Sequence, residues 1–249
     1  MTIDFPLHTI IFITLNMIAL GVFVWFGFSQ MVQGVTSAES TRNFWRWGVA
    51  LVLTGWLAVR IYLSLNPPGG SVLGPPYIIG AFVLVTLVGI VPLAYSPVFR
   101  QVVRAVPLAW LVGIHILRII GFVFLGLLDM KLLPAEFALP AGYGDIGAGL
   151  LALLAVYAIA TKNPRARTFA LIATAWGLLD FTVALVTGTA YLPRFGIQLA
   201  AQGISPLYLN YVLLIPSFGV PVLALLHVYT LRRLLSSPVT TIEHSRATN

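Results

Sequence analysis

Five ionisable residues lie inside stretches that are otherwise apolar enough to cross a lipid bilayer: Arg60, His115, Arg118, Asp145 and Asp180. A charge at that depth is costly unless it is paired or faces water, so such residues often mark ligand sites or proton pathways. Arginine and histidine could meet an anionic or carbonyl group, and histidine with aspartate could pass protons. These residue types therefore predict ligand binding or proton transfer, without identifying the ligand.

The spacing of the five residues indicates how they could meet. His115 and Arg118 are three positions apart and share one face of a helix. A rise of about 1.5 Å per residue, counted from the face with more basic loops, puts all five in the middle and opposite half of a core about 30 Å thick. Two cations and two anions are formally neutral, which a low dielectric favours.

This pattern favours an outward-facing charged pocket that binds or translocates a small anionic or amphipathic ligand, with a link to protons left open. Arg60 and Arg118 would be the anion partners, His115 the titrating group, and Asp145 and Asp180 the counter-ions or proton carriers. Five further residues are placed to line the pocket: Tyr62, Trp176, Tyr191, Tyr208 and Asn210.

Two other roles stay open. The two arginines could pair with the two aspartates and pin the helices together, which would make the protein a structural or accessory membrane subunit. The chain could also be an intramembrane enzyme that acts on a lipid or isoprenoid, with an Asp or His as acid or base. No spacing singles out a catalytic group, so the catalytic residues are unknown.

Composition indicates the class of protein that must position these residues. Hydrophobic residues make up 59% of the chain and charged residues 8%, and the mean hydropathy is +0.97. We therefore expect an all-α bundle of seven transmembrane helices over residues 1–235 and a disordered cytoplasmic tail over residues 236–249. The expected spans are His8–Val32, Phe44–Leu65, Tyr77–Tyr95, Pro107–Leu128, Ala141–Ala160, Thr168–Ala190 and Pro206–Leu231.

Loop charges predict the orientation of the bundle. Ten Lys and Arg residues fall in connections and ends on one side, whereas Lys131 and Arg194 are alone on the other. The positive-inside rule then places the N-terminus outside and the C-terminus in the cytoplasm. The net charge of +7 fits contact with anionic lipid, so membrane lipid is the expected partner and nucleic acid is not. A homo-oligomer is left open.

Two outer connections and one span contain helix-disturbing residues. LLPAEFALPAG and YLPRFGIQLAAQGISP are apolar and interrupted by Pro and Gly, so they could form lids, re-entrant elements or ordinary interfacial loops. Pro216 and Pro221 flank Ser217 and predict a kinked or broken last helix, which could form part of a binding site.

The sequence argues against several cofactors. Without cysteine the chain has no thiolate metal site, and we expect no metal. GYGDIG matches a dinucleotide fingerprint in letters only, because it opens a membrane helix; its small residues predict close helix packing. A retinal Schiff base needs a lysine that the last span lacks. His227 is expected near the inner face, about 12 Å from the level of His115, which argues against bis-histidine haem within one chain. Haem with one histidine ligand, or haem shared across a dimer, stays open.

One segment resembles a known group of proteins. IHILRIIGFVFL, followed by LLPAEFALPAGYGDIGAGLLAL, is similar to a segment of bacterial multi-pass membrane proteins of unassigned function. The similarity covers His115 to about Leu154 and carries the pattern H-x2-R followed by LP-x2-FA-x-PAG-x-GD. It implies a bacterial plasma membrane location and carries no catalytic assignment. It also groups seven residues in one unit: His115, Arg118, Pro134, Phe137, Pro140, Gly144 and Asp145.

Overall fold

The computed structural model describes residues 7–36 and 38–236, and all regular elements in these ranges are helical. Seven helices or stacked helical runs are long and apolar enough to cross a membrane, which confirms the predicted all-α, seven-helix class. The elements are α1 Leu7–Val35, α2 Glu39–Leu65, η1 Pro68–Gly70, α3 Pro75–Val85, η2 Thr86–Ile90, α4 Val91–Tyr95, α5 Pro97–Ala105, α6 Leu108–Gly113, η3 Ile114–Gly121, α7 Phe122–Asp129, α8 Ala135–Ala160, α9 Ala166–Ala201, η4 Pro206–Tyr208, α10 Leu209–Val212, η5 Ile215–Gly219 and α11 Val220–Ser236.

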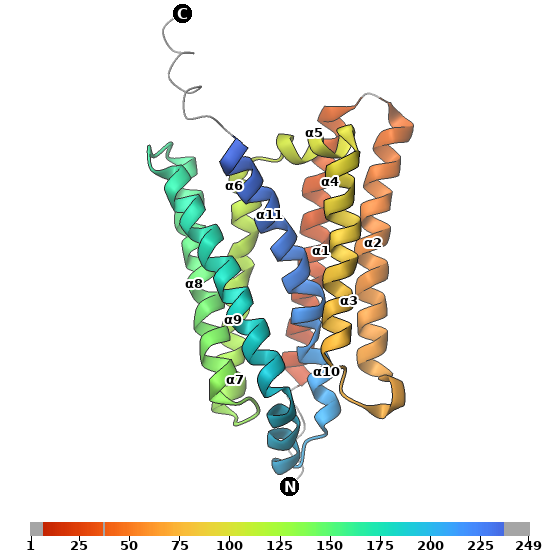
Figure 1. The fold of residues 1–249 in the computed structure, drawn as a ribbon, viewed down its shortest axis with the longest axis vertical. Helices are drawn as coiled ribbons and strands as arrows, with labels where there is room; N and C mark the ends of the chain where they lie inside the picture. The colour runs from red at the N-terminus through yellow and green to blue at the C-terminus, as the bar shows by residue number, and fades with distance from the viewer. Residues whose placement is uncertain (1–6, 37, 237–249) are drawn as a thin grey trace, which may run out of the picture.

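The last span is the central element of the bundle. In Figure 1, α8, α9 and the α6–α7 run lie on one side of α11, and α1, α2 and the α3–α4 run lie on the other. Of the most apolar window of Pro206–Leu235, 72% is buried, compared with 22% for each of α1 and α2. Side chains on the last span can therefore contact both groups of helices.

The bundle has an N-side end, where the described chain starts, and a C-side end, where α11 finishes. The N-side end holds the start of α1 and the connections after α2, α7 and α9; the C-side end holds the connections after α1, α4 and α8 and the end of α11. Nine of the ten basic residues predicted to share one side lie at the C-side end, and Arg246 lies outside the described residues. Most of the predicted tail, from residue 237 on, also lies outside them.

Two predicted boundaries are wrong, because α8 begins at Ala135 and α9 continues to Ala201. The segments expected to be lids or loops are therefore mostly helical extensions of two spans, with Pro140 and Pro193 inside the helices. Membrane helices tolerate such prolines when neighbouring helices satisfy the freed backbone groups. The extensions support each other, since the buried rings of Phe137 and Phe195 lie 5.0 Å apart.

Small residues bring the fourth, fifth and sixth spans close together, as predicted. A Cβ added at Gly121 would lie 2.8 Å from the carbonyl oxygen of Gly142 and 2.5 Å from the Asp145 Cβ. Alanines line the remaining contact between α8 and α9, with Ala152 and Ala173 both buried. Backbones packed this closely bring polar groups on three helices within reach of one another.

Two spans depart from α-helical geometry. The fourth contains the 3-10 segment η3, in which residues three positions apart lie almost directly above one another, so His115 and Arg118 align. The last contains the π-helical turn η5, with Pro216 inside it and Pro221 just after it. The predicted break in the last helix is therefore present, and such turns recur at functional sites.

Candidate functional site

Arg118 is the centre of a buried polar cluster, with 1% of its side chain exposed. Its Nε donates to Oδ1 of Asp145 over 2.7 Å, and its Nη2 donates to Oδ2 of Asp180. Its Nη1 donates to the carbonyl oxygen of Gly177 over 3.1 Å, and the Phe181 ring stacks 3.8 Å from the guanidinium carbon. All three guanidinium nitrogens therefore have protein partners, and η3, α8 and α9 are joined through one side chain.

Two histidines complete the cluster. The rings of His115 and His227 stack with centroids 3.6 Å apart and an interplanar angle of 9°. His227 Nε2 lies 3.5 Å from Nη1 of Arg118. Because the guanidinium is always protonated and can only donate, His227 Nε2 is the acceptor. Both ring nitrogens of His115 and Nδ1 of His227 are buried without a protein partner. Each such group costs about 1–3 kcal/mol unless something else bonds it.

The charge of the cluster is unbalanced. One guanidinium faces two carboxylates, and both histidines are buried away from water. With neutral imidazoles, the group carries a formal excess of one negative charge, which a low-dielectric surrounding disfavours. A single bound proton would neutralise it.

Glycines make the space that the cluster occupies. A Cβ at Gly177 would lie 2.7 Å from Arg118 Nη1 and closer still to the His227 ring, and a Cβ at Gly144 would overlap the Asp180 carboxylate. Gly144 also accepts a hydrogen bond from Trp176 Nε1 over 3.1 Å. The sequence pattern indicated close packing around Gly144 but gave no signal for Gly177.

The predicted level of His227 is wrong. The prediction counted down from Pro206, but the last span covers Pro206–Leu235 and begins with the short elements η4 and α10. His227 lies nine residues before Ser236, and His115 lies seven residues after Leu108, both counted from the C-side end. At the helical rise, these counts place His227 about 13 Å and His115 about 10 Å from that end. The two histidines therefore share a level. Stacked rings are not the opposed axial pair of bis-histidine haem, and the expectation of no haem stays a prediction.

Arg60 lies apart from this cluster in an environment of its own. Its side chain is buried, with 4% exposed, and its Nε donates to Ser217 Oγ over 2.9 Å. The Tyr77 ring lies 5.7 Å from its guanidinium carbon, while its Nη2 is buried without a hydrogen-bond partner. Within the described residues no carboxylate lies within ion-pair distance of Arg60. The predicted alternative in which both arginines pair with both aspartates therefore holds only for Arg118.

The loop after α2 is fastened beside Arg60. Asn210, which is fully buried, accepts a hydrogen bond from the Leu73 backbone over 2.7 Å and donates to the Ser71 carbonyl. Ser64 Oγ lies 2.9 Å from the carbonyl oxygens of both Arg60 and Asn210. These contacts hold the N-side end of α2 against the start of the last span.

The five residues expected to line one pocket are spread over several places. Asn210 lies beside the Arg60 region, and Trp176 contacts the backbone next to Asp145. Tyr62 is 63% exposed, the Tyr191 ring lies 5.3 Å from the Arg194 guanidinium, and Tyr208 packs against Tyr211. In the part of the chain that the structure describes, Tyr62 and Tyr191 contact neither buried arginine, so the five residues do not line one pocket.

The π-helical turn η5 links the two regions. Its Ser217 contacts Arg60, whereas its Ile215 and Pro216 line a cavity of about 60 Å³ that also contains Asp145 and Asp180. Ser217 Oγ, at 2.5 Å, also donates to the carbonyl oxygen of Leu213 inside the same span. A change in the geometry of this turn would therefore reach both the lone arginine and the carboxylates.

Comparison with known proteins gives a family without a described activity. No curated protein and no solved structure matches the chain. One family model matches residues 75–235, a range that contains Arg118, Asp145, Asp180 and both stacked histidines and excludes Arg60. Because this match covers more than half of the chain, the protein belongs to the family described as Domain of unknown function (DUF8737).

Proposed function

We propose that the protein binds, or moves across the membrane, a small anionic or amphipathic ligand whose negative charge is met by Arg60, and that binding is linked to a proton held near Arg118. The observation that carries this proposal is the buried Arg60 guanidinium, which has an unpartnered Nη2 and, among the residues that the structure describes, no carboxylate within ion-pair distance. A buried cation without a counter-charge is strongly disfavoured. A ligand anion would supply both the missing charge and the missing acceptor.

The proton has a place in the second region. The excess negative charge of the Arg118 cluster is cancelled by one proton on Asp145, Asp180 or a histidine. Three unpartnered imidazole nitrogens can each exchange hydrogen bonds with water or a ligand group. The turn η5 would couple the sites, because an anion on Arg60 would compete for the hydrogen bond that holds Ser217.

The orientation and location belong to the same proposal. The concentration of basic residues at the C-side end supports a cytoplasmic C-terminus and an outer N-terminus. The resemblance of the segment from His115 to about Leu154 to bacterial membrane proteins supports a bacterial plasma membrane. Arg60 lies five residues from the N-side end of α2. The ligand would therefore reach Arg60 from the outer face.

A structural role is the second candidate, and one observation favours it. Arg118 has protein partners on every nitrogen and joins three helices, as a clamp would. The two functions differ in what they require of Arg60: a clamp needs nothing from it, and the ligand proposal fails without it.

Calorimetric titration of the full-length protein in lipid nanodiscs tests the proposal. Inorganic phosphate and dodecanoate serve as probes, with protein-free nanodiscs as the blank. Arg60→Gln should weaken saturable binding of at least one probe by about tenfold or more, since it removes a hydrogen bond to a charged group. Arg194→Gln, which changes an exposed arginine at the same end, should leave it unchanged.

The proton link is read from the same titrations in two buffers with different ionisation enthalpies. Proton exchange makes the measured enthalpy depend on the buffer in the wild type, and Asp180→Asn should remove most of that dependence while binding persists. Equal affinity of Arg60→Gln and the wild type for both probes would contradict the ligand assignment. Equal enthalpies in both buffers would contradict the proton link.

A further inference from the structure

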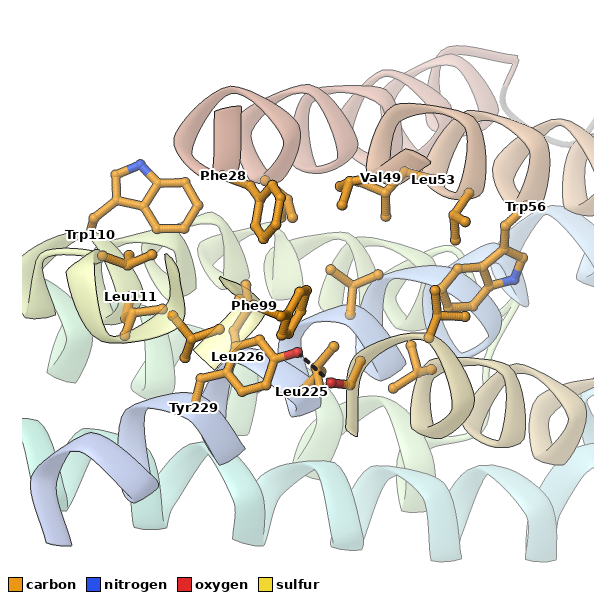
Figure 2. A pocket seen from close by; sticks show the side chains of 18 residues that line it. Phe28, Val49, Leu53, Trp56, Phe99, Trp110, Leu111, Leu225, Leu226 and Tyr229 are labelled. Carbon is orange, nitrogen blue, oxygen red and sulfur yellow. Dashed lines mark hydrogen bonds between the residues drawn. The ribbon is translucent and has the colours of Figure 1, made fainter. Parts of the chain in front are cut away.

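The C-side half of the bundle contains an apolar cavity whose lining includes neither Arg60 nor Arg118. It has a volume of about 110 Å³ and lies among α1, α2, η2, α5, α6 and α11. Figure 2 shows apolar and aromatic side chains pointing into it from all sides, with Trp56 and Trp110 at opposite ends of the view. Its lining phenol, Tyr229, already donates to the Gly89 carbonyl oxygen over 3.0 Å. Such a space favours hydrocarbon over water.

A strongly basic pocket adjoins this cavity. The pocket has a volume of about 360 Å³, and it shares Val103 and Tyr229 with the apolar cavity. Among the described residues, the lining of this pocket has no acidic side chain. Four arginines line it, two from α5 and two from α11: Arg100, Arg104, Arg232 and Arg233.

Backbone contacts hold two of these arginines in place. Arg100 Nη1 donates to the carbonyl oxygen of Ala94, and Arg233 Nη1 donates to the Arg104 carbonyl oxygen over 2.8 Å and to that of Val106. The partner of Arg100 is a neutral carbonyl, which fixes the side chain without cancelling its charge. Arg104 and Arg232 are exposed at the mouth of the pocket.

We infer that this pair of spaces is a binding site for an anionic phospholipid, with the phosphate head group among the four arginines and a short segment of one hydrocarbon chain in the apolar cavity. A phosphate suits the head site because arginine forms paired, charge-assisted hydrogen bonds with its oxygens. The size of the cavity limits the tail, since an apolar cavity of about 150 Å³ holds a benzene-sized group. One chain segment fits, and two do not. This site is separate from Arg60 and does not rest on the proposed ligand.

Native mass spectrometry of the full-length protein measures the site directly. The probes are phosphatidylglycerol and phosphatidylcholine with identical chains, and inorganic phosphate as a competitor. The wild type should retain one phosphatidylglycerol at least tenfold more tightly than phosphatidylcholine. Arg104→Gln with Arg232→Gln should lower that affinity by about tenfold or more, because each basic residue near an anionic lipid contributes to binding.

A matched pair of substitutions separates the site from general surface charge. Arg165→Gln with Arg167→Gln removes the same charge from the same end, outside the pocket, and should leave lipid retention unchanged. Val49→Phe, which fills the cavity, should weaken phosphatidylglycerol retention without touching the arginines.

Three results would overturn the inference. Equal retention of the two lipids would remove the head-group site. Equal losses in the pocket pair and the Arg165 and Arg167 pair would reduce it to a diffuse surface effect. Displacement of the lipid by stoichiometric inorganic phosphate would show a free-phosphate site in which the cavity has no part. Unchanged probe binding in Arg60→Gln would contradict the proposed function and leave this inference standing. Equal retention of the two lipids by the wild type, with probe binding lost in Arg60→Gln, would overturn this inference and leave the proposed function standing.

Discussion

Arg118 and Arg60 are both buried arginines within apolar spans, yet their surroundings are opposite. Arg118 has two carboxylates, a backbone carbonyl and an aromatic face around its guanidinium. Arg60 has one serine hydroxyl and the more distant face of Tyr77. The comparison teaches that burial of a charge alone does not reveal its role. A guanidinium satisfied by its own chain holds helices together, and an unsatisfied one is available to a ligand.

The largest expected difference between the regions concerns stability. Arg118→Gln leaves two buried carboxylates facing each other and should cost about 3–5 kcal/mol of unfolding free energy, the usual cost of breaking a buried ion pair. Arg194→Gln is the control, because the Arg194–Glu136 pair is 61% and 47% exposed and should contribute less than about 1 kcal/mol. Denaturant unfolding in lipid or detergent measures both. Equal losses for the two variants would show that Arg118 is not the clamp described here.

A smaller effect should follow from crowding the Arg118 cluster without changing its charge. Gly177→Ala places a Cβ 2.7 Å from Arg118 Nη1, so either the arginine or His227 must move. We expect a loss of about 1–3 kcal/mol, typical of overpacked sites. Gly196→Ala is the matched substitution in the same helix, where the nearest atom is 3.7 Å away. If both alanines have the same unfolding midpoint, the cluster is looser than the contacts indicate.

The smallest stability change should occur at Arg60, and its sign distinguishes an arginine without a counter-ion among the described residues from the paired Arg118. Arg60→Gln removes a buried charge that has no counter-ion in the described part of the chain, so the unfolding free energy should stay within about 1 kcal/mol of wild type or rise. The same unfolding experiment, run without added anion, gives the result. A loss as large as that of Arg118→Gln would mean that Arg60 has a strong partner within the protein.

The sequence predicts the fold class well because a spanning helix leaves a long apolar run. It also predicts the grouping of His115 and Arg118, since a spacing of three residues aligns in α-helical and 3-10 geometry alike. The ends of α8 and α9 are missed because Pro140 and Pro193 look like breaks, although both lie inside continuous helices, as membrane helices tolerate.

The partners within the site are harder to predict. Which aspartate meets which arginine depends on helix rotation and on glycines such as Gly177, and neither is visible in hydropathy. His227 is misplaced because a depth count assumes a straight helix that begins at the membrane surface, whereas this span begins with short elements and contains a π-helical turn. The stacking of His227 on His115 depends on the path of the whole last span.

The most direct test of the contrast between the two arginines is an experimental structure of the wild-type protein in lipid, at a resolution that shows non-protein density, with an anionic probe that binds in calorimetry. We predict density within hydrogen-bond distance of Arg60 Nη2, and Arg118 still bonded to both Asp145 and Asp180. Density inserted between Arg118 and its carboxylates, with Arg60 bonded to an acidic residue of the chain, would contradict the account.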